Sequence, residues 1–534
     1  MSGAKPRPES AAANGAPRSP AGHVGAPQIR DTLLRNTFWY GLVTFFGIAV
    51  GIVMSVVLAR GLGPTQMGEF SYVLWATRTM AAVATLGFAI GTVRYTASAI
   101  ARDDRALAWG IVHHLKRRQI AVATLVVGLT LPFVFLFAPE SMRWPFVVMA
   151  LGLFPITMEH IYSHALYGAN RYDLTAQTST VKMTLQLVAA IASLALGFGM
   201  VGLAIGIVGG SVVSTLIQAR RAQSIYPANG APVPDVVRRE LRGFLVPLSV
   251  VVVLDALVWD RSEVFFLRFW MDPHEIAFYS LAFGLATKAM IVPEITTGPL
   301  LPTFSALHGR GAIEEFRQVY RVALRNVVLV GVPISAVLAA IGPGLVTFLY
   351  GDEYRPVATL LGVMVVIATF VSTRKVAWMA LRGLGDQRCM VPASGIAALL
   401  NIGAAIVFIP IFHTWGAVLA STIGRVFATV TAFAVLARGH GCRPPMWDFA
   451  RIGVAGVLAY GATLSVAPES AGLLRLALGA GVGFATYVAA VLALRVVGPR
   501  DWQVIVGALK RRSARRTGSP PPAAVPVQPA PTEV

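Results

Sequence analysis

Residues 58–71 read LARGLGPTQMGEFS, and residues 266–280 read FLRFWMDPHEIAFYS. Both stretches follow an apolar segment, and both contain an arginine, a proline, a small residue, an aromatic residue and a serine in the same order. The match continues to Arg78 and Lys288, each of which follows an Ala-Thr pair. Such a recurrence predicts that the chain contains two copies of one structural unit.

A second pair of matching stretches lies further along the chain, around Gly168 and Gly383. The two pairs of matches are offset by 208 and 215 residues, so each copy covers six apolar segments. An even number of segments gives both copies the same orientation, related by an axis along the membrane normal. Chance recurrence of Gly and Pro turns is the alternative, and the consistent spacing of the matches argues against it.

The composition places the chain in a membrane. Hydrophobic residues make up 55% of the 534 residues and charged residues 13%. Soluble domains carry about 25% charged residues, so a chain with half that share cannot cover a surface that faces water. This excludes a soluble enzyme and a disordered protein. The net charge is +20, but the basic residues lie between apolar runs, so we expect no nucleic-acid partner. Two cysteines give neither a disulfide framework nor a metal cluster.

Between residues 37 and 494 the chain has fourteen apolar segments, most of them 18 to 25 residues long. That length lets a helix cross the hydrocarbon core, which is about 30 Å thick. With a cytoplasmic N-terminus, 36 Lys and Arg residues fall on the cytoplasmic side and five on the outer side. By the positive-inside rule, this asymmetry predicts that both termini are cytoplasmic.

We therefore expect an all-α integral membrane protein with about 14 transmembrane helices, in which two six-helix lobes are followed by two further helices. The expected organisation is a disordered cytoplasmic tail at 1–35, an N-lobe at 36–222, a cytoplasmic inter-lobe linker at 223–244, a C-lobe at 245–438, two helices within 450–496, and a disordered basic, Pro-rich tail at 510–534.

Two cations lie where charge is costly. A charged group at the bilayer centre costs about 2.5–3.5 kcal/mol on insertion scales, so a chain keeps one there only where it faces protein or a water-filled cavity. Arg78 and Lys288 are equivalent in the two copies, and both lie about 12–15 Å from the outer ends of their segments. They predict a positively lined cleft between the lobes. The alternative is that both side chains extend to the outer interface.

The fourth and tenth segments carry a second equivalent pair of charges, Glu159-His160 and Arg374-Lys375. Their opposite signs predict an ion pair between the lobes that holds one conformation closed, and anchoring at the cytoplasmic interface is the alternative. Arg425, in the twelfth segment, is a further cation without a charged counterpart in the first copy.

The seventh segment is the most polar, with Asp255, Asp260, Arg261 and Glu263. Asp260 and Glu263 are one helical turn apart and would share a face. A carboxylate inside the membrane can bind a coupling cation or a proton, whereas salt bridges at the outer interface are the alternative.

The stretch 58–70 resembles the start of polysaccharide flippases of the Wzx type, which belong to the multidrug/oligosaccharidyl-lipid/polysaccharide exporter (MOP) superfamily. Three further stretches also look like that family: 301–307, 349–354 and 400–417. The resemblance spans residues 35–440. The lipid II flippase branch of the superfamily is similar in fold, but the segment 37–58 lacks its arginine-rich pattern.

The resemblance implies a V-shaped transporter with alternating access and no catalytic activity, cofactor or metal. It would move a polyprenyl-pyrophosphate-linked oligosaccharide across the bacterial cytoplasmic membrane for surface polysaccharide synthesis, such as that of lipopolysaccharide, with polymerase machinery as a partner. The basic cavity that it implies would draw on Arg78, Lys288, Arg374, Lys375 and Arg425. The coupling or inter-lobe acidic groups would be Glu159, Asp255, Asp260 and Glu263.

Two other functions compete with this one. A cation-coupled multidrug exporter of the same superfamily needs acidic residues in its cavity, but this chain has more cations than anions near the midplane. A polyprenyl-dependent glycosyltransferase or polymerase needs catalytic carboxylates in sizeable outer loops. The outer loops here are mostly 5 to 11 residues long, and the pair Asp103-Asp104 lies on the predicted cytoplasmic side.

Overall fold

The computed structural model describes residues 26–227, 229–298, 300–386, 389–468 and 472–496, and within them every regular element is a helix. The first half contains α1 (Ala26–Thr85), α2 (Phe88–Ala101), α3 (Arg105–Phe137), α4 (Glu140–Leu151), α5 (Leu153–Gly168), α6 (Tyr172–Ala195) and α7 (Gly199–Gln223).

The second half contains α8 (Asp235–Trp259), α9 (Glu263–Trp270), α10 (Pro273–Ala289), α11 (Ile291–Ile295), α12 (Leu300–Gly309), α13 (Ile313–Tyr350), the short η1 (Asp352–Tyr354), α14 (Arg355–Gly383), α15 (Met390–Phe412) and α16 (Thr414–His440). The helices α17 (Met446–Val466) and α18 (Leu473–Ala493) follow. The predicted all-α membrane fold is confirmed. Of the two predicted tails, 1–25 and 510–534 lie outside the described residues, and α1 begins within the first.

Eleven helices of the described residues are long and apolar enough to cross a membrane, or twelve when α10 and the bent segment Ile291–Gly309 count as one span. In α1, Gly63 has a φ of 71° and a ψ of 171°, so α1 consists of two helices joined at a kink. Glycine adopts this backbone conformation without strain, and Pro64 begins the second helix with its φ already fixed. The number of fourteen crossings remains a prediction.

Turn residues set the other boundaries. Asp104 caps α3, because its carboxylate accepts a hydrogen bond from the backbone N–H of Leu107 at 2.8 Å. Leu86 and Gly87 both have positive φ values and separate α1 from α2. The second half has a comparable break, where Met290 separates α10 from α11.

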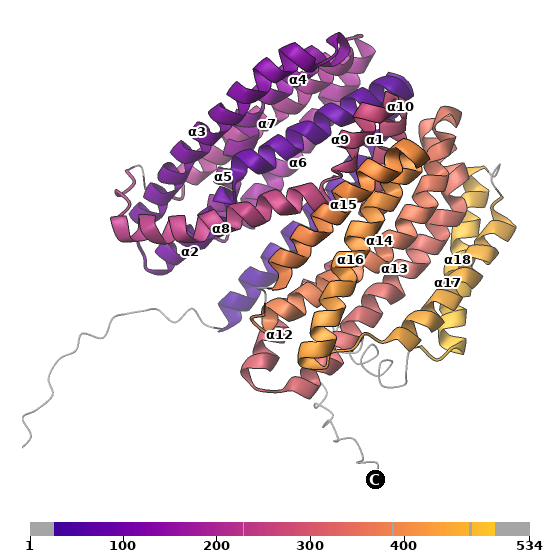
Figure 1. Ribbon diagram of the computed structural model, residues 1–534. Coiled ribbons are helices and arrows are strands. Elements are labelled where there is room, and N and C mark those ends of the chain that lie inside the picture. The colour runs from indigo at the N-terminus through magenta and orange to yellow at the C-terminus, as the bar shows by residue number, and fades with distance from the viewer. Residues whose placement is uncertain (1–25, 228, 299, 387–388, 469–471, 497–534) are drawn as a thin grey trace, which may run out of the picture.

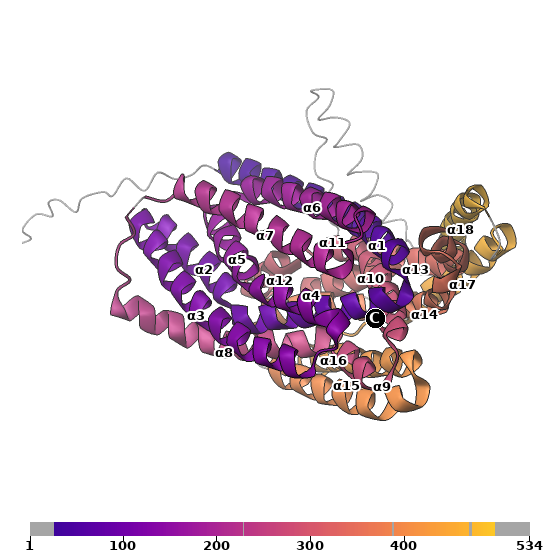
Figure 2. The same ribbon diagram turned by 90° about the horizontal axis from the view of Figure 1, so that it is seen from above.

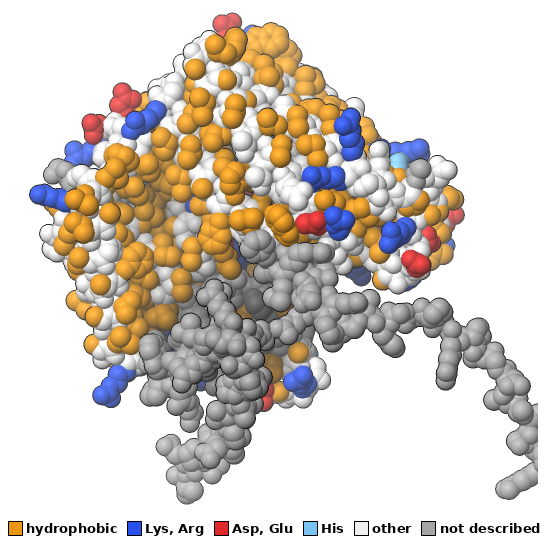
Figure 3. Space-filling model, turned by 180° about the vertical axis from the view of Figure 1, so that it is seen from behind, with side chains coloured by type: hydrophobic (Ala, Val, Ile, Leu, Met, Phe, Trp, Pro, Cys, Tyr) orange, Lys and Arg blue, Asp and Glu red, His pale blue; other side chains and the backbone are white. Residues whose placement is uncertain are grey.

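The outer surface is apolar, as lipid contact requires. Leu125, Leu129, Phe133 and Leu136 of α3 are 58% to 75% exposed, which would be costly in water. Figure 3 shows hydrophobic side chains spread across one face of the molecule. We therefore treat this surface as lipid-facing.

The two lobes meet along α1. Its side chains and backbone contact α10 and the α13–η1 corner of the other lobe (Figure 1). The guanidinium of Arg60 donates hydrogen bonds to the carbonyl oxygens of Phe348 and Leu349 at 2.6 and 2.8 Å. The hydroxyl of Tyr354 donates to the carbonyl oxygen of Ala59 at 2.9 Å. This contact lies next to the kink of α1, in the part of the helix that the charge pattern assigns to the outer side.

Helix α8 belongs to neither lobe alone. It begins at Asp235, inside the predicted linker 223–244, and its first half packs on α2 and its neighbours, where Leu245 lies against Gly91. The hydroxyl of Ser249 donates to the carbonyl oxygen of Leu86 at 2.7 Å. Further on, α8 and α9 pack against α15 of the C-lobe, and Figure 1 shows α8 passing from α2 toward α15.

The last two helices stand outside both lobes. The pair α17 and α18 packs against α13 at the edge of the molecule (Figure 2), as expected for segments outside the repeat. Their shared core includes Ile452, Ala459 and Tyr487, whose hydroxyl donates to the carbonyl oxygen of Leu329 at 2.8 Å.

The close approach of the lobes at Gly68 gives a test of this interface. A Cβ atom at Gly68 would lie 1.7 Å from the carbonyl oxygen of Pro273, so Gly68→Ala forces the two backbones apart. Overpacking of this kind costs about 1–3 kcal/mol. We expect a lower thermal unfolding midpoint for purified Gly68→Ala in detergent. Gly128→Ala is the control, because nothing lies within 4 Å of its Cβ position. Equal midpoints for both variants would contradict the tight contact.

Candidate functional site

Three cations gather where α1 of the N-lobe meets the start of the C-lobe. Arg78 lies on the second arm of α1, Lys288 lies near the end of α10, and Arg261 lies in the turn between α8 and α9. The ammonium group of Lys288 donates to the carbonyl oxygen of Gly51, at 3.4 Å, across the lobe interface. Arg78 and Arg261 lie near enough to Lys288 for their charges to act on it, so we treat the three cations as one group.

Phe283 connects this group to a second set of cations. The guanidinium carbon of Arg261 lies 5.6 Å from the centroid of the Phe283 ring, and that of Arg425 lies 4.6 Å from it. Both contacts are within cation–π range. The aromatic ring therefore holds an arginine of the α8–α9 turn and an arginine of α16 in one region without neutralising either charge.

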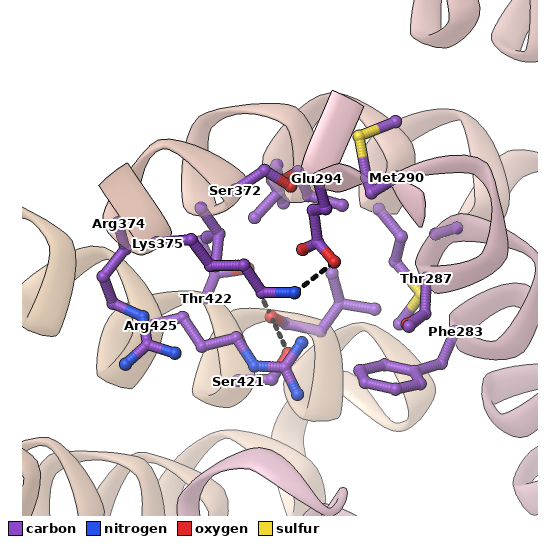
Figure 4. A pocket seen from close by; sticks show the side chains of 16 residues that line it. Phe283, Thr287, Met290, Glu294, Ser372, Arg374, Lys375, Ser421, Thr422 and Arg425 are labelled. Atoms are coloured by element: carbon purple, nitrogen blue, oxygen red, sulfur yellow. Dashed lines mark hydrogen bonds and ion pairs between the residues drawn. The ribbon is translucent and has the colours of Figure 1, made fainter. Parts of the chain in front are cut away.

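Arg425 lines a cavity of about 250 Å³ between α10, α14 and α16 together with Arg374 and Lys375. Figure 4 shows the three basic side chains in this cavity, with Lys375 directed at Glu294. Lys375 forms an ion pair with Glu294, and the guanidinium of Arg374 lies over the ring of Trp378 at 4.2 Å. The C-lobe cavity thus has three cations and one carboxylate among its lining residues.

The N-lobe has a cavity of its own, of about 320 Å³, whose lining includes Arg78, Lys182 and Gln186. Lys182 forms an ion pair with the buried Glu159 at 2.8 Å, and the hydroxyl of Ser214 donates to the other oxygen of that carboxylate at 3.0 Å. Both lobes therefore contain a lysine–carboxylate pair beside a cavity.

These pairs correct one prediction. The ion pair predicted between Glu159-His160 and Arg374-Lys375 is not formed by Glu159 and Lys375 in this structure, because each of these two residues has a partner of opposite charge in its own lobe. A buried carboxylate needs such a partner close by, and Lys182 supplies it for Glu159. The equivalence of positions in the repeat was a poor guide to which side chains pair.

Glu263 is fully buried in the C-lobe. Its carboxylate accepts hydrogen bonds from the hydroxyl of Tyr279, at 2.9 Å, and from the side-chain amide of Asn401. Asn401 in turn accepts a hydrogen bond from Ser262 at 3.0 Å. The network joins the start of α9 to α10 and α15.

The predicted shared face of Asp260 and Glu263 is wrong. Helix α8 ends at Trp259, and the turn that follows includes Arg261 with a φ of 60°. Asp260 is exposed in this turn, whereas Glu263 begins the next helix and is buried. The side chain of Asp255 lies outside the described part of the structure.

The site has several members that the sequence did not single out. Arg261 is predicted only as part of salt bridges at the outer interface, and Lys182, Phe283 and Glu294 are not predicted as site residues. Lys182 and Glu294 could have been found in the sequence, because each is a charged residue in or close to an apolar segment. Nothing in the sequence marks Phe283, since its role depends on contacts with the α8–α9 turn and with α16.

The arrangement suits an anion. Guanidinium and ammonium groups bind phosphates through charge-assisted hydrogen bonds, and they do so more strongly in sites shielded from water. The cations extend from the N-lobe cavity, past the lobe interface, to the C-lobe cavity. Among the described residues, no group of three or more His, Cys, Asp or Glu side chains could hold a metal ion.

Comparisons with known proteins agree with this description. A family model described as "Polysaccharide biosynthesis protein" matches residues 33–308, slightly more than half of the chain. A second model, described as "Lipid II flippase MurJ", matches residues 278–484. No curated protein matches the chain.

The fold is also found in solved structures. A lipid II flippase MurJ in an inward closed conformation has a TM-score of 0.69 at 12% identity, covering 84% of this chain and 97% of its own. An inward-facing multidrug resistance MATE family transporter of the MOP superfamily has a TM-score of 0.64 at 16% identity, covering 74% and 94%. A MOP superfamily transporter from Pyrococcus furiosus, whose binding pocket is described as having reverse polarity, has a TM-score of 0.56 at 17% identity, covering 76% and 95%. At these identities the likeness establishes the fold.

The network around Glu263 can be tested through stability. In Glu263→Ala, the hydroxyl of Tyr279 and the amide of Asn401 lose their acceptor in a buried place, at a cost of about 1–3 kcal/mol. We expect a clearly lower unfolding midpoint in detergent than for Asp260→Ala, which removes an exposed carboxylate three residues away. If the two variants unfold at the same temperature, the buried network does not stabilise the C-lobe.

Proposed function

The chain belongs to the polysaccharide biosynthesis protein family, and from this we propose that it is a flippase for a polyprenyl-pyrophosphate-linked oligosaccharide. It is a multi-pass membrane protein with the fold of MOP superfamily transporters. The substrate would move from the inner to the outer leaflet of the bacterial cytoplasmic membrane, where polymerising machinery would receive it. Both termini would lie in the cytoplasm, in accord with the positive-inside rule.

The observation that carries the proposal is the group formed by Arg78, Arg261 and Lys288. A diphosphate is the charged part of such a substrate, and it needs several cations in a place that the lipid tail can reach. Three like charges held close together at a lobe interface repel one another. A bound diphosphate would relieve this repulsion, whereas a neutral or cationic substrate would not.

The second set of cations gives the diphosphate a further place to bind. Arg374, Lys375 and Arg425 lie in the C-lobe cavity, and Phe283 contacts both Arg425 and Arg261 of the first set. A diphosphate could move between the two sets in short steps. The polyprenyl tail would remain in the bilayer, and the glycan would cross through the hydrated space between the lobes.

The lobes are joined in a way that suits alternating access. They are held together along α1, while α8 packs on both lobes and is followed by a non-helical turn at 260–262. Breaks at Gly87 and Met290 divide the equivalent helices of the two halves. Such breaks absorb changes in backbone angles when rigid units rock against each other. We propose that the lobes rock about the α1 contact.

An ion gradient would act through a carboxylate. Of the two carboxylates of the seventh segment whose side chains the structure describes, we propose that Glu263 holds the coupling ion. It is buried, and the oxygens of Ser262 and Tyr279 lie in the same network. Asp260 is exposed and would exchange with solvent.

A multidrug exporter is disfavoured by the same cavities. A cationic drug needs an unneutralised carboxylate, but Glu159 and Glu294 are each paired with a lysine. Resistance to cationic dyes on expression would favour the exporter.

The proposal is tested by mass spectrometry of lipids from a deletion strain that has no second flippase. We expect a polyprenyl-pyrophosphate oligosaccharide to accumulate, and wild-type protein to remove it. The double variant Arg78→Ala/Lys288→Ala should fail to remove it at an equal protein level in the membrane, because the diphosphate loses two of its cations.

The control is Arg451→Ala, which removes a cation that lies over Trp447 on α17, away from both lobes. It should restore transport like the wild type. If the double variant also restores transport, the cation group does not bind the substrate. If no lipid-linked oligosaccharide accumulates in the deletion strain, the chain is not a flippase for one.

A further inference from the structure

A second basic site lies away from the lobe interface, where α3 and α8 both begin. It is a hollow of about 580 Å³, lined on one side by Gly110, His113, His114 and Arg117 of α3. The loop 229–233 and Arg238 of α8 line the other side. No carboxylate is among these lining residues. The charge pattern assigns this end of the helices to the cytoplasm.

The shape of the hollow is fixed by contacts between the loop 229–233 and α3. The loop is fixed against α3, because the backbone N–H of Ala231 donates to the carbonyl oxygen of Ala106 at 2.9 Å. Gly110 permits this approach, since a Cβ atom there would lie 1.9 Å from the carbonyl oxygen of Ala231. Beneath the hollow, the ring of Trp109 stacks on that of Tyr226 with centroids 5.1 Å apart.

The positive charge inside the hollow is largely unopposed. His114 lines the hollow together with Arg117 and Arg238, and the charges of these two arginines act on its ring. Arg238 has one acidic neighbour, Asp235, at 3.3 Å, but the side chain of Asp235 is 84% exposed. An ion pair so open to water cancels little of the field. The basic side chains from two helices therefore indicate that the ligand of this hollow is an anion.

The depth of the hollow indicates which anion. On α3 the exposed residues from Ile120 onward are mostly apolar and lipid-facing, whereas Arg117 and Arg118 just before them are exposed and charged. The edge of the hydrocarbon therefore lies between Arg118 and Ile120. His114 is one turn beyond that edge, or about 6 Å at 1.5 Å per residue, which is the level of the lipid headgroups.

We propose that this hollow binds the phosphate of an anionic phospholipid headgroup from the cytoplasmic leaflet. The phosphate lies between His114 and Arg117 of α3 and Arg238 of α8, and it links the two helices. Because α8 continues to the C-lobe, the bound lipid holds the first part of α8 on the N-lobe. The site is separate from the cations at the lobe interface.

The test uses native mass spectrometry of the full chain, released from nanodiscs that contain phosphatidylglycerol and phosphatidylcholine in equal amounts. We expect wild-type protein to retain phosphatidylglycerol preferentially. Arg117→Gln/Arg238→Gln should lower that retention by about tenfold or more, since each arginine near an anionic headgroup contributes substantially to binding.

The matched control is Arg118→Gln/Arg239→Gln, which removes the same charge from the neighbouring exposed positions outside the hollow. It should retain the lipid nearly as well as the wild type. Equal loss in both double variants would overturn the proposal, because it would mean that general surface charge attracts the lipid. Equal retention of both lipids by the wild type would overturn it as well.

A second measurement separates a lipid headgroup from a free phosphate. Thermal unfolding in detergent is followed with inorganic phosphate or with phosphatidylglycerol added. We expect phosphatidylglycerol to raise the midpoint of the wild type, but not that of Arg117→Gln/Arg238→Gln, and phosphate to have little effect at equal concentration. If phosphate alone stabilises the wild type as well as the lipid does, the ligand is a soluble anion. Similar midpoints of the two double variants without added ligand show that both are folded.

Discussion

The cost of a charge in hydrocarbon determines where this chain can place its ionised side chains. A lone cation or carboxylate inside the bilayer is too costly to keep without a partner, a cavity or an aromatic face. The structure uses all three means: Lys182 pairs with Glu159, Arg78 lines the N-lobe cavity, and Arg425 lies over Phe283. Arg78, Arg261 and Lys288 are the instructive case, because like charges gain nothing from one another. Their position at the junction of the lobes is the feature on which the proposal of an anionic cargo rests.

The same constraint explains which parts of the fold could be predicted. Apolar segments of membrane length and the repeat around Arg60 and Arg268 indicate the all-helical class and the two lobes. They can be recognised because a segment that crosses lipid must be apolar along its whole length. The position of α8 could not be predicted. Its first half packs on the N-lobe through Leu245 and Ser249, and nothing local distinguishes a helix that serves two lobes from one that serves a single lobe.

The site shows the same division. A charge inside an apolar segment is visible in the sequence, so Arg78 and Lys288 could be found. The partner of a charge depends on which helices become neighbours, so the pairing of Glu159 with Lys182, and that of Lys375 with Glu294, could not. The turn around Arg261 interrupts the helix, so Asp260 and Glu263 do not share a face. The sequence did not predict this break, and the helix face predicted across it was therefore wrong. The contact between Phe283 and two arginines joins three elements far apart in the chain.

We propose that the cations at the lobe junction recognise a diphosphate on a lipid. This is tested by the affinity of the purified protein for a short-chain polyprenyl diphosphate, compared with the uncharged polyprenol of the same length. We expect the diphosphate to bind much more tightly, and we expect Arg78→Ala/Lys288→Ala to weaken its binding by about tenfold or more while binding of the polyprenol stays unchanged. Equal affinity of the wild type for the two lipids, or a diphosphate affinity unaffected by the double substitution, would contradict it.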